Sequence, residues 1–285
     1  MRQLRRLRAH DAECRDTYYP ALGIGRFDFG DEIVWLDVLG VRISAVDVVV
    51  ATDEINRWVQ QRYRSYVTLT GVHGVMESIR NEEVRRAHNA AGLVLPDGMP
   101  LVWLLWHGGF ALADHVTGRD LMLALFNQFQ QAGYRHFLYG ATPRTLELLI
   151  DNLNQKFPAA KVVGAYAPPF RPAGADEDEA VIEAINTSAA DIVWVGLSTP
   201  KQELWMARHR HRLAAPVLIG VGAAFDFHAG LLRRAPRWVQ RAGLEWAFRM
   251  AMEPRRLAKR YLRNNPAFLA LLIADKLRLR RAPIK

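Results

Sequence analysis

The chain has 285 residues, half of them hydrophobic, which is enough to bury a large core in one large domain or two small ones. Its single cysteine, Cys14, excludes a disulfide framework within the chain and favours a reducing compartment such as the cytoplasm. The net charge of +9 lies in the tail, because residues 233–285 hold 15 Lys/Arg against three acids, whereas residues 1–232 hold 23 against 26.

The first 30 residues show no clear periodicity, and we expect a loosely packed arm. They begin with basic residues, as a secretory signal does, but polar residues follow in place of an apolar segment, so we predict no export signal. Strand and helix patterns then alternate as far as residue 232. We therefore divide the chain into an arm (1–30), a Rossmann-like domain (31–232), which the site residues below make the catalytic candidate, and a basic helical appendage (233–285).

Residues 32–44 are typical of two short strands around Leu39 and Gly40, followed by a helix over 45–63. Further short segments, apolar on both faces and rich in β-branched residues, predict strands of a buried parallel sheet at 66–70, 92–95, 135–139, 161–166, 191–196 and 216–221. Helical patterns separate these strands. Right-handed βαβ units are the usual product of such alternation, so we predict an α/β fold with a mostly parallel sheet sandwiched by helices.

Glycines and polar residues follow five of the predicted strands, at the edge of the sheet where ligands bind in such folds. These loops are 71–74, 96–98, 140–142, 197–203 and 222–226. Backbone N–H groups at such turns can hold a phosphate, so a nucleotide diphosphate would fit. For any single loop, however, an ordinary strand-to-helix turn is the better interpretation. The stretch "GVGAAF" (220–225) matches only half of the dinucleotide fingerprint.

Asp97 lies between apolar runs in "VLPDGMPLVW" (94–103), where an unpaired carboxylate costs several kcal/mol to bury. It is placed to cap a helix that starts near Met99. It is equally placed at a strand end in partly apolar surroundings, which would raise its pKa and let it accept a proton from a substrate hydroxyl. Local sequence does not separate the two interpretations, which can coexist.

The sequence gives little indication of a metal site. The "DED" stretch (176–178) resembles an Asp-x-Asp metal element, but its place before a helical pattern favours charges that complement a helix N-terminus. His73, His107, His115 and His228 show no ligand spacing such as H-E-x-x-H. We therefore predict no metal.

The basic tail interleaves Arg and Lys with aromatic residues. After Pro254 we expect five basic residues to share one helical face, with Leu257, Tyr261 and Leu262 elsewhere around the helix. The five are Arg255, Arg256, Lys259, Arg260 and Arg263. This pattern favours contact with an anionic membrane surface. A solvated basic face and an RNA-binding tail are the alternatives, and the tail contains no recognised nucleic-acid module. The apolar run 268–274 is far shorter than the roughly 20 residues that span a bilayer.

Five blocks of the chain, in their order and approximate spacing, resemble the WecG/TagA/CpsF glycosyltransferases, glycosyltransferase family 26. The blocks, within residues 33–261, are "VLPDGMPLVW", "HVTGRDLMLAL", "VWVGLSTPKQELWM", "GVGAAFDFHAG" and "RAPRWVQRAGLEWAFRMAMEPRRLAKRY". The resemblance implies inverting transfer of a sugar from a UDP-sugar to a polyprenyl-diphosphate-linked saccharide, with no metal or other cofactor. It implies a cytoplasmic protein on the inner face of the plasma membrane, whose appendage completes the active site. It leaves a homo-oligomer open.

The same resemblance implies roles for individual residues. Asp97 matches the family's proposed catalytic base. The residues expected at the nucleotide sugar are Thr68, Thr70, Gly140, Gly196, Gln202, Gly222 and Asp226. Those expected at the acceptor or the diphosphate are His115, Arg233, Arg237, Arg241 and Arg249. The chain departs from its relatives at Thr70, where a Thr-x-Asn pattern is common, and at His115, where arginine is common.

Two other functions remain as alternatives. A nicotinamide-dependent oxidoreductase is supported only by the predicted sheet and residues 220–225. A nucleic-acid-binding protein is supported only by the basic tail, and it would show steeply salt-dependent affinity. The transferase interpretation, without a nucleic-acid partner, explains more of the sequence.

Overall fold

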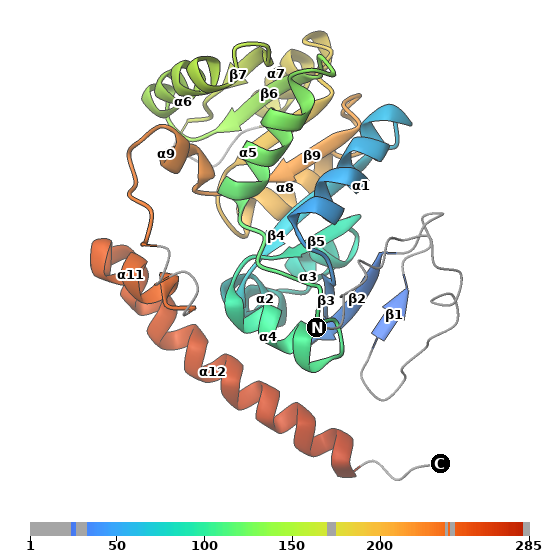
Figure 1. The fold of residues 1–285 in the computed structure, drawn as a ribbon, viewed down its shortest axis with the longest axis vertical. Helices are drawn as coiled ribbons and strands as arrows, with labels where there is room; N and C mark the ends of the chain where they lie inside the picture. The colour runs from blue at the N-terminus through green and yellow to red at the C-terminus, as the bar shows by residue number, and fades with distance from the viewer. Residues whose placement is uncertain (1–23, 27–32, 170–174, 237–238, 240–242, 282–285) are drawn as a thin grey trace, which may run out of the picture.

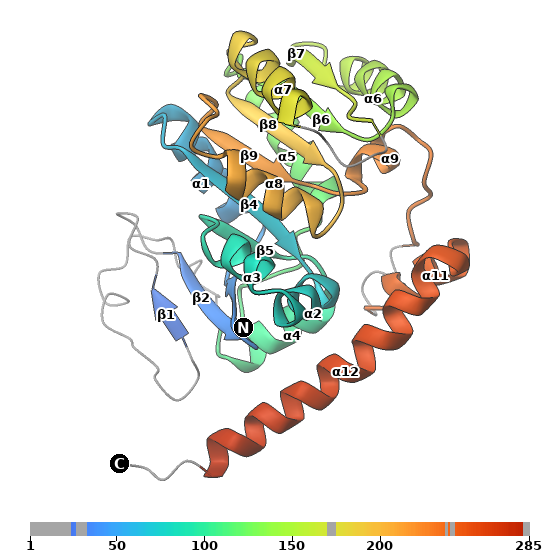
Figure 2. The same cartoon turned by 180° about the vertical axis from the view of Figure 1, so that it is seen from behind.

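The structure is a computed structural model that describes residues 24–26, 33–169, 175–236, 239 and 243–281. Its centre is a six-stranded sheet in the order β5-β4-β9-β8-β6-β7, with every pair parallel (Figures 1 and 2). The strands are β4 (Ser65–Thr70), β5 (Leu93–Pro96), β6 (Arg135–Gly140), β7 (Lys161–Tyr166), β8 (Ile192–Gly196) and β9 (Val217–Gly220). The predicted Rossmann-like fold is confirmed, with strand bounds within a residue or two.

One strand departs from the expected burial. We expected every strand of the sheet to be apolar and buried on both faces, but the residues of β7, at one edge of the sheet, alternate between exposed and half-buried. Water reaches β7 because it has a neighbouring strand on one side only, whereas β5, at the other edge, is covered by β3 (Val41–Ser44). The other five strands of this sheet are almost entirely buried.

Helices cover both faces of the sheet. One face is packed by α1 (Val48–Gln60), α5 (Gly118–Phe129), α6 (Pro143–Lys156) and α9 (Ala224–His228). The other face is packed by α2 (Val72–Arg80), α3 (Glu82–Asn89), α4 (Met99–His107), α7 (Ala175–Thr187) and α8 (Lys201–His209). The sequence explains these faces: Leu121, Leu125 and Phe129 recur every four residues along α5, and all three are buried.

A three-stranded antiparallel sheet stands beside the main one. It consists of β1 (Ile24–Arg26), β2 (Val34–Val38) and β3 (Val41–Ser44), and the predicted turn at Leu39 and Gly40 joins the last two. The Ser44 hydroxyl accepts a hydrogen bond from Val94 N of β5 (3.1 Å), which ties the two sheets together. Because β1 pairs with β2, at least this part of the expected loose arm belongs to a sheet.

The C-terminal segment forms α11 (Glu245–Met252) and α12 (Pro254–Arg281), and α12 packs against α2 (Figure 1). No described helix is long and apolar enough to cross a membrane. Two residues of α12 lie on a different side of the helix from the one that we expected. Arg260 is half-buried at the domain, whereas Leu262 is 69 % exposed on the same side as Arg255, seven residues away.

Candidate active site

A cavity of about 270 Å³ opens at the carboxyl edge of the parallel sheet. The loops after β4, β5, β8 and β9 line it, and the start of α5 and residues of α11 and α12 close it. The N-terminal ends of α2, α4, α5 and α8 all contribute to its wall. Each of these ends carries unpaired backbone N–H groups and the positive end of a helix dipole, so the cavity is suited to an anion such as a diphosphate.

Asp97 lies at the rim of this cavity, directly after β5. Its backbone N donates to Thr70 O of the neighbouring β4 (2.9 Å), which fixes the strand end. Gly98, with a φ of +140° that other residues rarely adopt, then turns the chain into α4. Gly98 is the residue that precedes the helix, and no side chain caps it, so the cap interpretation of Asp97 is wrong. The expected apolar burial is wrong too, because the Asp97 side chain is 44 % exposed.

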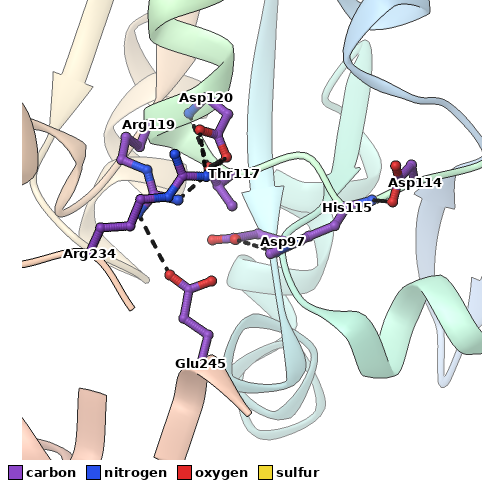
Figure 3. A network of polar contacts seen from close by, with 8 residues as sticks. All are labelled: Asp97, Asp114, His115, Thr117, Arg119, Asp120, Arg234 and Glu245. Carbon is purple, nitrogen blue, oxygen red and sulfur yellow. Dashed lines mark hydrogen bonds and ion pairs between the residues drawn. The ribbon is translucent and has the colours of Figure 1, made fainter. Parts of the chain in front are cut away.

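His115 is the polar partner of Asp97. Its Nε2 lies 3.4 Å from Asp97 Oδ1, and its side chain is 19 % exposed (Figure 3). Burial lowers the pKa of His115, but the hydrogen bond and charge of Asp97, with the charges of Glu245 and Asp120, outweigh it and raise the pKa above its ordinary value. The structure therefore brings together the predicted base and a residue predicted at the acceptor or diphosphate.

Arg119 is a cavity residue that we did not predict. Its side chain is 8 % exposed, and its guanidinium lies 3.4 Å from Asp120 Oδ2 and 3.7 Å from Glu245 Oε1 (Figure 3). The guanidinium also lies over the Phe227 ring, 5.1 Å from its centroid. The sequence could have indicated Arg119 as a cavity residue, because it lies in the block "HVTGRDLMLAL" directly after Thr117 and Gly118, where a capped helix begins.

Gln202 holds two loops of the cavity in place. Its side-chain Oε1 accepts from Gly222 N (3.0 Å), and its Nε2 donates to Glu203 Oε1 (3.0 Å). Glu203 is fully buried and also accepts from the Thr199 hydroxyl (2.9 Å). The predicted residues Gln202 and Gly222 therefore both line the cavity, and a buried hydrogen-bond network links them.

Several residues predicted at the nucleotide sugar do not line this cavity: Thr68, Thr70, Gly140, Gly196 and Asp226. The two threonines are buried in β4, and neither hydroxyl has a hydrogen-bond partner among the described residues. Gly140 and Gly196 are paired in the sheet, and a Cβ on Gly140 would lie 2.6 Å from the Gly196 backbone. A Cβ on Gly196 would lie 2.7 Å from the Phe225 ring, so the missing side chains serve the close approach of β6 to β8 and of β8 to α9. The assignment of these five residues to the nucleotide sugar stays a prediction.

The predicted arginines of the appendage divide into three cases. Arg249 lines the cavity, with its guanidinium 5.7 Å from the centroid of the Phe227 ring. Arg233 is exposed and does not line the cavity. Arg237 and Arg241 lie outside the described residues.

α12 adds four cavity residues that sequence reasoning did not assign to the site, Arg260, Tyr261, Asn264 and Asn265. The Asn264 amide Nδ2 lies 3.0 Å from Nδ1 of His73 in α2, and its Oδ1 accepts from Arg80 (2.7 Å). Burial, and to a lesser degree the charge of Arg260, lowers the pKa of His73 to about 4, so its Nδ1 is an acceptor for the amide at neutral pH. No local pattern indicated these contacts, because they join residues almost 200 positions apart.

The described residues contain no group of three or more His, Cys, Asp or Glu side chains placed to hold a metal ion. The "DED" stretch (176–178) lies in the first turn of α7, as we predicted from the helical pattern that follows it. Its Asp178 contacts Nε1 of Trp205 (3.3 Å) and Nε2 of His209 (3.5 Å), which lie on α8. These contacts tie α7 to α8.

Comparison with known proteins gives two kinds of similarity. The sequence profile of the Glycosyl transferase WecG/TagA/CpsF family matches residues 36–282. A protein of Bacillus spizizenii, named N-acetylglucosaminyldiphosphoundecaprenol N-acetyl-beta-D-mannosaminyltransferase, is 29 % identical over 180 residues, which are 63 % of this chain and 68 % of that protein. A protein of the same name from Bacillus subtilis is 25 % identical over 197 residues, 69 % of this chain and 75 % of its own length.

Proposed function

Because this chain belongs to the WecG/TagA/CpsF glycosyltransferase family, we propose that it transfers a sugar from a UDP-sugar to a polyprenyl-diphosphate-linked saccharide, with inversion and without a metal. The names of the two Bacillus relatives support this class of acceptor, and they make N-acetylmannosamine the first donor sugar to test. The further proposal is that the chain works on an anionic membrane surface, where such an acceptor resides.

One observation carries the proposal: a carboxylate lies at the rim of a cavity whose wall includes several helix N-termini and three arginines. Asp97 is the carboxylate, and Arg119, Arg249 and Arg260 are the arginines. Within the described part of the chain, Arg249 and Arg260 form no ion pair, so their charge is available to a ligand. A proton acceptor beside a diphosphate-binding wall is the arrangement that transfer from a nucleotide sugar requires.

In the proposed reaction, an acceptor hydroxyl attacks the anomeric carbon of the donor sugar while Asp97 takes its proton. The bond from this carbon to the diphosphate oxygen breaks on the opposite face, a glycosidic bond forms, and UDP leaves. The configuration at the anomeric carbon is thereby inverted. The arginines and the backbone N–H groups stabilise the charge that develops on the departing diphosphate.

The test is the substitution Asp97→Asn, which keeps the shape of the side chain and removes its ability to accept a proton. We expect acceptor-dependent UDP release to fall by about 10²- to 10⁴-fold, with UDP affinity within a few-fold of the unmodified protein. Turnover is measured with UDP-N-acetylmannosamine, other UDP-sugars and a polyprenyl-diphosphate N-acetylglucosamine acceptor, and UDP binding is measured by calorimetry. Asp151→Asn on the exposed side of α6 is the matched control and should change neither quantity.

Near-normal turnover of the Asp97→Asn protein would remove Asp97 as the base. Absence of acceptor-dependent UDP release with every donor would contradict the transferase proposal itself. NAD is included in the binding assay, and binding of NAD in place of UDP would favour an oxidoreductase.

A further inference from the structure

Asp97 has a polar partner inside the cavity. Its side chain is almost half exposed, and the group that contacts it is His115, through Asp97 Oδ1 and His115 Nε2 at 3.4 Å. The orientation of the Asp97 carboxylate therefore involves this imidazole.

Backbone hydrogen bonds fix the position of His115. Val116 N donates to Pro96 O (3.0 Å), which places the 114–116 segment alongside the end of β5. On the other side, Asp114 N donates to Val46 O (3.2 Å), and Asp114 Oδ1 accepts from His115 N (2.7 Å). The imidazole is thus attached to a segment held at both ends, and it meets Asp97 across a fixed distance.

The charged groups around His115 are mostly acidic. Asp97 follows β5, Asp114 lies on the same loop as His115, Asp120 is on α5 and Glu245 begins α11 (Figure 3). Two arginines lie beyond them and pair with these acids: Arg119 with Asp120 and Glu245, and Arg234 with Asp120 (3.2 Å). The imidazole therefore faces carboxylates on several sides, and the nearest is Asp97.

We propose that His115 is a positioning residue for Asp97, holding one carboxylate oxygen by Nε2–H and setting through its own charge how readily the other oxygen accepts the proton of the acceptor hydroxyl. This inference rests on the proposed transferase function. A neutral imidazole orients the carboxylate without opposing its negative charge. A protonated imidazole also orients it, but the positive charge a few ångströms away makes the carboxylate a weaker base.

A dependence of the rate on pH follows. The hydrogen bond and charge of Asp97, with the charges of Glu245 and Asp120, raise the pKa of His115 above its ordinary value, so the imidazole loses its proton at a higher pH than a free histidine does. The other histidine of the cavity wall, His73, has its pKa lowered to about 4 and is neutral throughout this range. A neighbouring cation lowers the pKa of a carboxylate by about one to three units. The proton is only partly transferred to the base in the transition state, so the rate changes by less than the full difference in basicity. We therefore expect kcat/KM to rise by roughly three- to thirty-fold as His115 becomes neutral.

The experiment compares the pH profiles of kcat/KM for the full-length protein and two variants. His115→Gln keeps an N–H donor without a titratable charge, so we expect the rising limb to vanish and the rate at alkaline pH to stay within a few-fold. His115→Arg places a permanent cation there, so we expect a flat profile near the lower plateau. His107→Gln, at the exposed end of α4, is the matched control and should retain the limb.

A His115→Gln profile that superimposes on that of the unmodified protein would overturn the inference. So would a variant whose only change is a higher KM for the acceptor or donor, because that result would place His115 in binding.

A second measurement needs no turnover and separates this inference from the proposed function. The His115 imidazole is titrated by NMR in the unmodified protein and in Asp97→Asn, and its signal is assigned by its absence from the His115→Gln spectrum. We expect the pKa of His115 to fall by about one unit or more when Asp97 loses its charge. An unchanged pKa would refute the pairing even if sugar transfer is found. A lowered pKa would support the pairing even if every donor fails.

Discussion

At the scale of single residues, the candidate site depends on side chains that satisfy buried polar groups. Gln202 is the clearest example, since its amide joins Gly222 N of one cavity loop to the buried carboxylate of Glu203. A buried donor or acceptor that loses its partner retains its full desolvation cost. The loop geometry of the cavity and the stability of the fold therefore depend on the same side chain.

We predict that Gln202→Leu lowers the free energy of unfolding by about 1–3 kcal/mol, because Gly222 N and Glu203 Oε1 each lose a hydrogen bond. UDP affinity should weaken as well, since the loop after β9 lines the cavity. Urea unfolding and UDP calorimetry measure the two effects. Gln128→Leu, at an exposed position of α5, should change stability by less than about 0.5 kcal/mol. Equal effects of the two substitutions would argue against the network.

At the scale of elements, the packing of α12 on α2 brings appendage residues to the cavity. Leu257 and Phe268 are buried along one side of α12, and Asn264 between them contacts His73 and Arg80 of α2. This contact needs a neutral His73, because a protonated Nδ1 cannot accept the amide hydrogen. The attachment of the helix is therefore sensitive to acid.

The sign of this pH effect follows from the lowered pKa of His73. The His73 imidazole binds a proton near pH 6.5 in the unfolded chain and near pH 4 in the folded one. Its contribution to the free energy of unfolding is therefore complete above pH 6.5 and is lost as the pH falls to about 4. We expect His73→Gln to reduce the loss of unfolding free energy across this range by an amount on the order of 2 kcal/mol. Urea titrations at several pH values measure it. His211→Gln, at an exposed position, should leave the pH dependence unchanged.

At the scale of the whole molecule, α12 extends along the end of the molecule opposite to α6 and β7 (Figures 1 and 2). Its outward side carries the exposed basic residues Arg255, Lys259 and Arg263 together with the exposed Leu262 and Leu269. Positive charge beside apolar side chains suits the surface of an anionic bilayer. The opposite side of the same helix supplies Arg260 to the cavity, so binding of this face to a membrane would set the active site beside the bilayer.

We predict that reversing three charges, with Arg255→Glu, Lys259→Glu and Arg263→Glu together, weakens binding to anionic vesicles by roughly 10²-fold or more. The reason is that each basic residue near such a surface contributes about 1 kcal/mol. Sedimentation with phosphatidylserine-containing vesicles measures the affinity. The same charge change at Arg144, Lys156 and Lys161, on α6 and β7, is the control and should have a smaller effect. Equal losses would indicate only a dependence on net charge.

The helices, the strands and their layers could be predicted from the amino-acid sequence alone. Strands and helices follow from the local spacing of apolar residues, and parallel strands with polar loops at their ends fix the edge where a site forms. Asp97, Gln202 and Gly222 line the cavity for this reason, since each lies between the end of a strand and the first turn of the next helix. The family was also identifiable, because its blocks are contiguous stretches of sequence.

The contacts between side chains of the site, in contrast, could be known only from the folded chain. Asp97 proved to be an exposed carboxylate paired with His115, whereas Gly140 and Gly196 permit close contact with a neighbouring strand and with Phe225 of α9. The inward position of Arg260 depends on contacts between α2 and α12 that join distant residues. The physical reason is that local periodicity reports which face of an element is apolar, whereas burial, pKa and pairing depend on the neighbours that folding brings to that face.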